Sequence, residues 1–179
     1  MGDLTRLSHK LDEKTGVCRA IIETPKGRRS KFDYDPHTGL FKLKAVLPDG
    51  MSFPLDYGFI PSTLADDGDP ADVMVLMDEP ACVGALIDVR LIGVVEAEET
   101  EHGRSERNDR LLAVASFSHI YADVRAPEDL PRTFLAHLGD FWMNKERLEG
   151  KEFKVLRLGD ASDAVRLVKK SSKAAKAQA

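Results

Sequence analysis

The stretch ADDGDPADVMVLM, residues 65–77, joins a cluster of acids to an apolar run and raises the question of function. Asp67, Asp69 and Asp72 fall within six residues around a glycine and a proline, and Asp66 stands just before them. Glycine, proline and aspartate favour a tight turn. The continuous apolar run that follows, residues 73–77, is typical of a short buried strand. The sequence therefore predicts an acidic turn at the mouth of a strand that enters the core.

Outward from this stretch, apolar and β-branched patterns predict a series of short strands. The segments with these patterns are residues 17–25, 30–35, 40–46, 86–99, 110–117 and 151–158. Residues 52–70 contain Pro54, Gly58 and Pro61 and are expected to be mostly loop. The charged segment 96–109 is expected to form a solvated hairpin tip. Together the patterns predict a mainly β protein with flanking helices (α+β), built as a small closed or partly closed barrel.

Helical spacing appears only near the C-terminus, where two helices are expected to pack outside the barrel. Pro131 suits the first position of one helix and Gly150 its end, and Asp160 is a suitable N-cap for the other. We therefore divide the chain into an N-terminal extension at 1–14, a single barrel domain at 15–168, and a frayed basic tail at 169–179.

Composition narrows the classes of function. The 179 residues are 42% hydrophobic and 31% charged, which is typical of one soluble globular domain. The net charge of −4 argues against a general binder of nucleic acid or of anionic membranes. No apolar run approaches the roughly 18 residues of a membrane span. Cys18 and Cys82 lack metal-binding spacing and fit a reducing compartment. We expect a cytoplasmic protein without nucleic-acid or membrane partners.

The aspartates of the turn need a source of positive charge unless water screens them. Carboxylates roughly 6 Å apart repel by about 2–3 kcal/mol per pair at an effective dielectric near 20. Their oxygens are the hard ligands that Mg²⁺, Mn²⁺ and Ca²⁺ prefer. An EF-hand does not fit, because Ala71 and Asp72 stand where its fifth-position ligand and its glycine belong. A solvated turn without metal is the alternative.

A cluster of three or more acids indicates several metal ions with a phosphate compound between them, since Mg²⁺ takes only one or two protein carboxylates. Such a site also needs basic and phenolic groups to hold phosphate oxygens. Lys31, Lys44 and Tyr57 are the upstream candidates. No nucleophile elbow, dinucleotide fingerprint or P-loop pattern competes with this interpretation.

The segment DGDPADV, residues 67–73, resembles the signature of the soluble (family I) inorganic pyrophosphatases, Asp-x-Asp-[Pro/Glu]-apolar-Asp-apolar. The similarity extends over roughly residues 17–158. It implies a small distorted five-stranded OB-like barrel that binds several Mg²⁺ ions, with Mn²⁺ as a substitute, and hydrolyses pyrophosphate to two phosphates. It also implies a homo-oligomer, a hexamer or a dimer.

The resemblance assigns metal ligands residue by residue. Asp67 and Asp72 would bind the first metal, and Asp69 would contact metal and act as the general base for the attacking water. Glu23 would be an outer acidic group of the metal site. For the substrate, it places Tyr57 with the catalytic and phosphate-binding groups, and phosphate oxygens would also contact Lys31, Lys44, Arg110 and Lys145.

Several positions depart from the family pattern. Lys44 replaces an arginine and loses its bidentate fork. Glu99 is the nearest counterpart of a metal-binding acid in a loop about four residues longer than usual. Asn108 aligns with another metal ligand, and a bulge could instead bring Asp109 inward. Three further substitutions put Asp33, Phe53 and Asn144 where the family has glutamate, tyrosine and tyrosine, and Arg110 replaces a lysine.

These departures leave two alternatives to pyrophosphate hydrolysis. One is the same chemistry on another phosphoanhydride, such as a nucleotide or short polyphosphate. The other is a non-catalytic barrel that binds phosphate or a protein partner. The substitution Asp69→Ala separates them from each other, because only an enzyme has turnover to lose.

Overall fold

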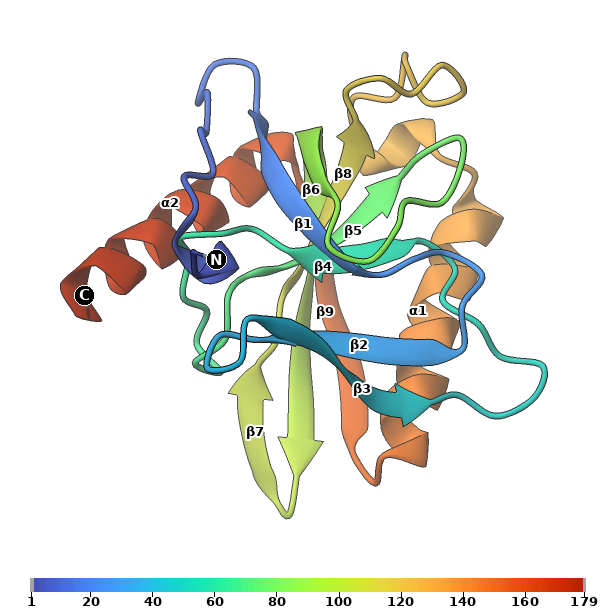
Figure 1. Ribbon diagram of the computed structural model, residues 1–179. Helices are drawn as coiled ribbons and strands as arrows, with labels where there is room; N and C mark the ends of the chain where they lie inside the picture. Colours follow the sequence, from blue (N-terminus) through green and yellow to red (C-terminus); the bar gives the residue numbers. More distant parts are fainter. Residues whose placement is uncertain (1, 179) are drawn as a thin grey trace.

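The computed structural model describes residues 2–178. Its centre is a closed ring of five strands, whose arrangement can be followed in Figure 1. Around the ring the order is β1 (Val17–Thr24), β4 (Asp56–Phe59), β5 (Asp72–Leu76), β8 (Arg110–Ala115) and β6 (Leu86–Glu101). Pairing of β6 with β1 closes the barrel. The β5–β8 pair is parallel and the other pairs are antiparallel. The prediction of a five-stranded barrel is confirmed.

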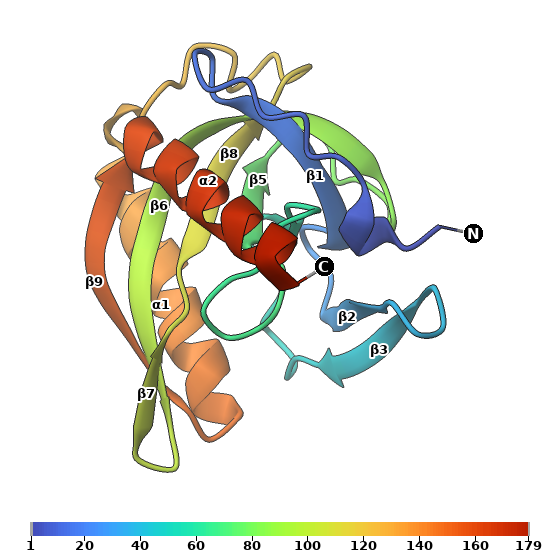
Figure 2. The ribbon, with the colours of Figure 1, turned by 90° about the vertical axis from the view of Figure 1, so that its left-hand side faces the viewer.

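The remaining elements cover or extend this ring. β9 (Glu152–Asp160) pairs along β6, and β7 (Arg104–Arg107) forms a hairpin with the far end of β6. β2 (Ser30–Asp35) and β3 (Leu40–Val46) form a separate two-stranded sheet. α1 (Arg132–Leu148) packs beside β9, and α2 (Ala161–Gln178) crosses over β6 (Figure 2). Two short 3₁₀ helices, η1 (Leu4–Arg6) and η2 (Pro127–Asp129), complete the described elements.

β5 separates two halves of the hydrophobic core. Val73 and Val75 pack in the half that includes Ala164 and Val168 of α2. Met74 and Leu76 pack in the half that includes Trp142 of α1. Because successive side chains of a strand point to opposite faces, a strand buried on both faces must be apolar throughout. This explains the uninterrupted run after the acidic turn.

The strand β4 corrects the expectation of loop over residues 52–70. Asp56–Phe59 is buried at every position and pairs with both β1 and β5. A Cβ at Gly58 would lie 1.9 Å from the carbonyl oxygen of Ile21, so only glycine allows β1 to approach this closely. Of the residues that predicted a loop, Gly58 allows this close contact, and Pro54 and Pro61 flank the two ends of the strand.

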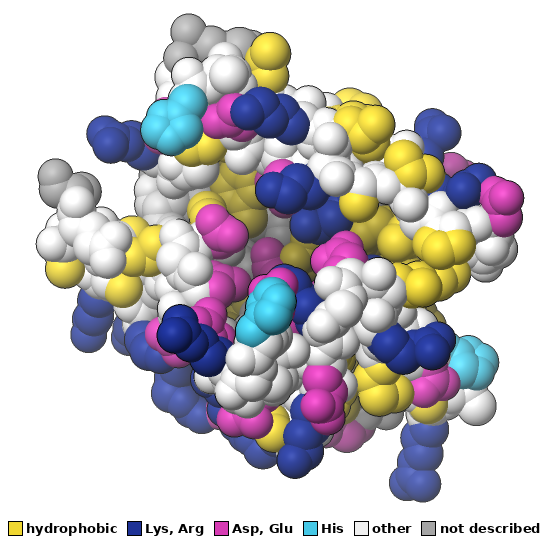
Figure 3. Space-filling view, turned by 90° about the horizontal axis from the view of Figure 1, so that it is seen from below, with side chains coloured by type: hydrophobic (Ala, Val, Ile, Leu, Met, Phe, Trp, Pro, Cys, Tyr) yellow, Lys and Arg dark blue, Asp and Glu magenta, His cyan; other side chains and the backbone are white. Residues whose placement is uncertain are grey.

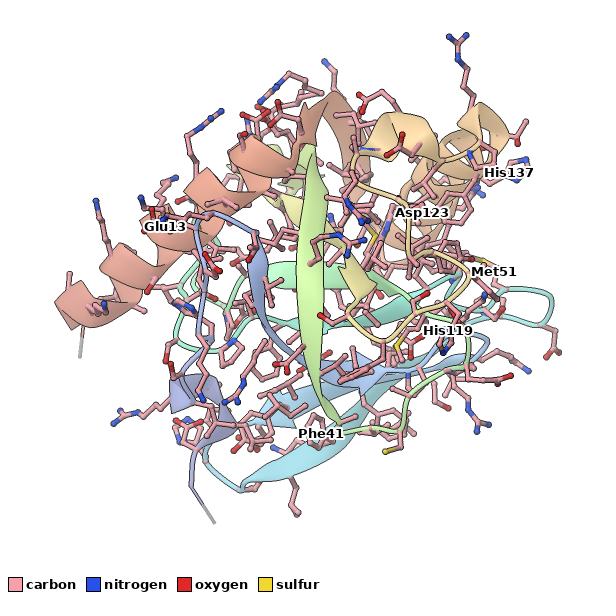
Figure 4. The ribbon with its side chains drawn as sticks, turned by 90° about the horizontal axis from the view of Figure 1, so that it is seen from above. Glu13, Phe41, Met51, His119, Asp123 and His137 are labelled. Atoms are coloured by element: carbon pink, nitrogen blue, oxygen red, sulfur yellow. The ribbon has the colours of Figure 1, made fainter. Side chains whose placement is uncertain are left out.

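The two ends of the chain pack against the barrel. In the N-terminal segment the Ser62 N–H donates to the Thr5 carbonyl at 2.6 Å, and Arg19 N–H to the His9 carbonyl at 2.8 Å. The frayed tail predicted at 169–179 is wrong as far as Gln178, because α2 continues to that residue. Lys169 pairs with Glu13, which lies beside α2 (Figure 4), at 2.7 Å. Met1 and Ala179 lie outside the described residues.

The helix boundaries follow local capping. Asp160 accepts a bond from the Asp163 N–H at 2.9 Å while Asp163 accepts one from the Asp160 N–H at 3.1 Å, a reciprocal capping box at the start of α2. Gly150 adopts φ +81° directly after α1. Within residues 2–178 no helix is long and apolar enough to cross a membrane.

Candidate active site

One cleft of about 1350 Å³ collects every residue that the sequence assigned to a site. Acidic and basic side chains gather around a hollow in the face seen in Figure 3. The predicted residues that line the cleft are Glu23, Lys31, Lys44, Tyr57, Asp67, Asp69, Asp72, Glu99, Asn108, Arg110 and Lys145. They come from β1, β2, β3, β4, β5, β6, β8, α1 and the connecting loops, so the barrel brings together groups that are distant in sequence.

The acidic turn is fixed by its own backbone. The Asp69 N–H donates to Oδ1 of Asp67 at 3.1 Å, and the Ala65 N–H donates to the Asp69 carbonyl at 2.7 Å. Gly68 between the two aspartates adopts φ +92°, which favours glycine. The Thr63 hydroxyl accepts a bond from the Ala71 N–H at 2.9 Å and holds the turn to the preceding loop. The turn therefore presents its carboxylates from a constrained backbone.

Three acids of the cleft are harder to ionise than free carboxylic acids. Burial raises the pKa of Asp72 to about 6, although Arg110 and hydrogen bonding with Tyr57 oppose the shift. Burial raises the pKa of Glu23 to about 8 in spite of a 2.7 Å bond from the Tyr34 N–H. Partial desolvation also raises the pKa of Asp67, although the hydrogen bond from the Asp69 N–H opposes the shift. These groups lack enough positive charge from the protein alone.

The structure answers which of Asn108 and Asp109 faces the cleft. The Asn108 amide nitrogen donates to Oε2 of Glu99 at 3.0 Å inside it. Asp109 points away, where Oδ1 accepts a bond from the Ala97 N–H at 3.0 Å and pairs with Arg107 at 2.8 Å. No bulge brings Asp109 inward. The cleft therefore has an amide where the family pattern has a carboxylate.

Cations suited to phosphate oxygens line the same cleft as the acids. Lys31 pairs with Asp33 at 3.0 Å; burial lowers the pKa of Lys31, but this pairing outweighs it and the net shift is upward. The Arg110 guanidinium lies over the Trp142 ring, 4.1 Å from its centre. Lys145 is buried on α1, whereas Lys44 on β3 is exposed and free to adjust. The cleft therefore has both fixed and mobile cationic groups.

Two of the departures lie outside this site. Phe53 is buried in the core and packs edge-on against Phe141 with ring centres 5.4 Å apart. Asn144 is exposed on α1, where its amide donates to the Asp140 carbonyl at 2.8 Å. Neither side chain lines the cleft. Sequence reasoning missed Glu146, a buried carboxylate of the cleft whose only signal was its place next to Lys145.

The donor set fits hard divalent cations. Carboxylates and one amide oxygen are the ligands that Mg²⁺ and Mn²⁺ prefer, and burial raises the pKa values of Glu23, Asp67 and Asp72, a cost that a bound cation would offset. Within residues 2–178 no three acidic, histidine or cysteine side chains already converge on one point as a metal cage. Glu99 instead pairs with Lys151, and with Arg110 at 3.8 Å.

A barrel with this cleft at its mouth defines a metal-dependent hydrolase of phosphate compounds. The profile of one protein family, described as inorganic pyrophosphatase, matches residues 20–176. The chain belongs to the inorganic pyrophosphatase family and is accordingly an inorganic diphosphatase.

Relatives agree in sequence and in fold. The inorganic pyrophosphatase of Synechocystis sp. is 34% identical over 171 residues, covering 96% of this chain and 98% of its own. That of Nostoc sp. is 36% identical over 174 residues, covering 97% and 99%. The crystal structure of the Thermus thermophilus inorganic pyrophosphatase superposes with a TM-score of 0.88 at 31% identity, covering 98% of this chain and 99% of that one. The family resemblance and the enzyme class predicted from the sequence are confirmed.

Proposed function

We propose that this chain hydrolyses inorganic pyrophosphate to two phosphates in a Mg²⁺-dependent reaction, with Asp69 as the general base. The observation that carries the proposal is one cleft in which an acidic turn with unmet charge faces a set of cations. Carboxylates alone would repel a phosphate compound, and cations alone would bind it without activating water. Only together do the two sets suit a bound metal and its anionic substrate.

The metal ligands would be Asp67, Asp69 and Asp72 from the turn, with Glu23 and Glu99 nearby. Asn108 uses its amide nitrogen toward Glu99, which leaves its amide oxygen to face a cation. When bound, Mg²⁺ would screen the phosphate charge and lower the pKa of a coordinated water. Mn²⁺ has the same ligand preference and would substitute.

Substrate binding falls to the cations of the cleft. Lys31, Arg110 and Lys145 would pair with phosphate oxygens, and Tyr57 would donate its hydroxyl. Lys44 is exposed and would close on the outer phosphate. Water oxygen then forms a bond to one phosphorus while its proton passes to a carboxylate oxygen of Asp69. The bridging P–O bond breaks, its electron pair stays on the bridging oxygen, and two phosphates result.

Phosphate release from Mg-pyrophosphate at neutral pH tests this proposal. The wild-type chain should release phosphate rapidly, and Asp69→Ala should lower the rate by about a thousandfold, since it removes the base and one metal contact. The matched control is Asp66→Ala, because Asp66 flanks the same turn, pairs with Lys170 at 3.0 Å and lies outside the cleft. Release by Asp69→Ala at the control rate would contradict the assignment. Nucleotides and polyphosphate in the same assay separate the alternative substrates.

We further propose a homo-oligomer, hexamer or dimer, that works in the cytoplasm. Phe117 and Ile120 support association, because they are 84% and 70% exposed on the loop that carries His119 (Figure 4). The two unpaired cysteines, Cys18 and Cys82, fit a reducing compartment. Light scattering on the purified chain should give a multiple of the 19.8 kDa mass, and a monomer would contradict this proposal.

A further inference from the structure

Two cations of the cleft share one buried carboxylate. Oε1 of Glu146 accepts a bond from Nη2 of Arg110 at 3.0 Å and from Nζ of Lys145 at 3.1 Å. The exposed fractions are 1% for Glu146, 2% for Arg110 and 4% for Lys145, so water does not screen these pairs. A single oxygen atom thus fixes the distance between a cation on β8 and a cation on α1.

The guanidinium of Arg110 is also held on its other sides. Its central carbon lies 4.1 Å from the centre of the Trp142 ring and 4.6 Å from that of Phe153. Nη1 donates to the Asn108 carbonyl at 3.1 Å. Lys145 has one further partner, Glu149 at 3.0 Å, whose side chain is 35% exposed. Glu146 is therefore the only described residue with a hydrogen bond to both cations.

Glu146 is poorly suited to a role in stability alone. Its second oxygen, Oε2, is buried and has no hydrogen-bond partner. Burying a carboxylate with one oxygen unsatisfied costs free energy, and an apolar side chain of similar size often serves packing better. A buried carboxylate at this position is expected if the positions of Arg110 and Lys145 matter more for function than the lost stability.

We propose that Glu146 is a positioning residue that sets Arg110 and Lys145 at the spacing needed to bind the two phosphate groups. The inference rests on the proposed function, since it assigns both cations to the substrate. Glu146 acts through its neighbours and has no contact with the reacting atoms. Its removal should weaken substrate and analogue binding together, which raises KM and leaves kcat nearly unchanged.

The test compares Glu146→Gln with wild type and with Glu96→Gln. Glutamine keeps the shape and removes the charge, so we expect KM for Mg-pyrophosphate to rise about tenfold, with kcat changed by less than about threefold. The Kd of methylenediphosphonate, a non-hydrolysable analogue, should rise by the same factor in calorimetry. Glu96→Gln is the matched control because Glu96 pairs with Arg107 at 3.1 Å and lies outside the cleft. It should leave both constants unchanged.

A lower melting temperature for Glu146→Gln with KM and analogue Kd at wild-type values would overturn the proposal and leave a purely structural role. If this variant does not fold, Glu146→Asp keeps the charge and withdraws it by one methylene. It should also raise KM and Kd, and wild-type values would equally overturn the proposal. Were the wild-type chain inactive on pyrophosphate, the proposed function would fail, and inorganic phosphate binding to the same variants would still decide the role of Glu146.

Discussion

Two groups of ion pairs near β6 use the same residue types with opposite results, although Arg107 of the first group also lines the cleft. The outer network consists of Glu96, Arg107, Asp109, Arg157 and Asp163. Arg107 pairs with Asp109 at 2.8 Å and Arg157 with Asp163 at 2.8 Å, and Glu96 contacts both arginines. Although burial opposes the shift, these arginines hold the pKa of Glu96 below its usual value.

Acids of the cleft show the opposite pKa shift. The pKa values of Glu23, Asp67 and Asp72 are raised, and buried polar atoms of Arg110 and Glu146 have no partner. The carboxylates of the outer network each pair with an arginine, whereas the cleft combines ion pairs, such as that of Glu146 with Arg110, and carboxylates whose pKa is raised by burial. The gathering of several acids with raised pKa values in one cleft, rather than the number of charged residues, marks the functional side of the barrel.

The largest expected effect comes from neutralising Asp72. Asp72→Asn should lower pyrophosphatase activity about a thousandfold, or about 4 kcal/mol in transition-state stabilisation, because it removes a metal ligand. Without metal the same variant should unfold at higher urea concentration than wild type at pH 8, since a destabilised charge is gone. Asp163→Asn in the outer network should do the opposite, with activity kept and stability lowered. If Asp72→Asn kept its activity within tenfold of wild type, the functional difference between the cleft and the outer network would be contradicted.

Next in size is the pH dependence of stability without metal. The folded pKa values of Glu23, about 8, and Asp72, about 6, lie above those of the unfolded chain. The folded protein therefore binds more protons between roughly pH 4 and 8, and its free energy of unfolding should fall by a few kcal/mol as pH rises across that window.

Urea unfolding at pH 5 and pH 8 measures this slope, first with a chelator and then with Mg²⁺. Mg²⁺ should flatten the slope, because a bound cation stabilises the ionised carboxylates. Glu96→Gln should keep the slope, since arginines lower the pKa of Glu96 and its side chain lies outside the cleft. Equal stability at the two pH values in the chelator would show that the acids of the cleft are not destabilised.

The smallest effect concerns the amide that replaces a carboxylate. Asn108→Asp should lower the Mg²⁺ concentration for half-maximal activity about tenfold, since it returns one negative charge to the cleft. Asp109→Asn is the control: Asp109 faces Arg107, so its loss should leave the Mg²⁺ requirement unchanged. A Mg²⁺ requirement that responds to Asp109 and not to Asn108 would reverse the orientation assigned to this pair.

Sequence alone predicted the parts of the molecule that depend on local pattern. The acidic turn and the apolar strand after it were evident, because turn residues lead up to Asp72 and a strand buried on both faces is apolar without interruption from Val73. β4 was missed because its signal depends on a distant strand: Gly58 is required by Ile21, which no local rule detects. The extent of α2 was missed for the same reason, since Ser171 and Ser172 are buried only by tertiary contacts.

The site divides in the same way. The carboxylates and lysines could be assigned from a motif and its surroundings. The orientation of Asn108 against Asp109 was left open, because residues just before a strand do not have to continue its alternation. Glu146 had only its place next to Lys145 as a sequence signal, because its role depends on Arg110, 36 positions away in the chain.

The position of β5 between the two halves of the core has a consequence for how the enzyme responds to its ligands. The amide hydrogens of this strand bond to β4 and β8, and both faces of the strand are covered. They can exchange with solvent only when the whole barrel opens. The acidic turn is rooted in this strand, so cation binding at the turn would slow exchange at the centre of the molecule. Hydrogen exchange in a buried strand would thus report the occupancy of the exposed carboxylates in the turn.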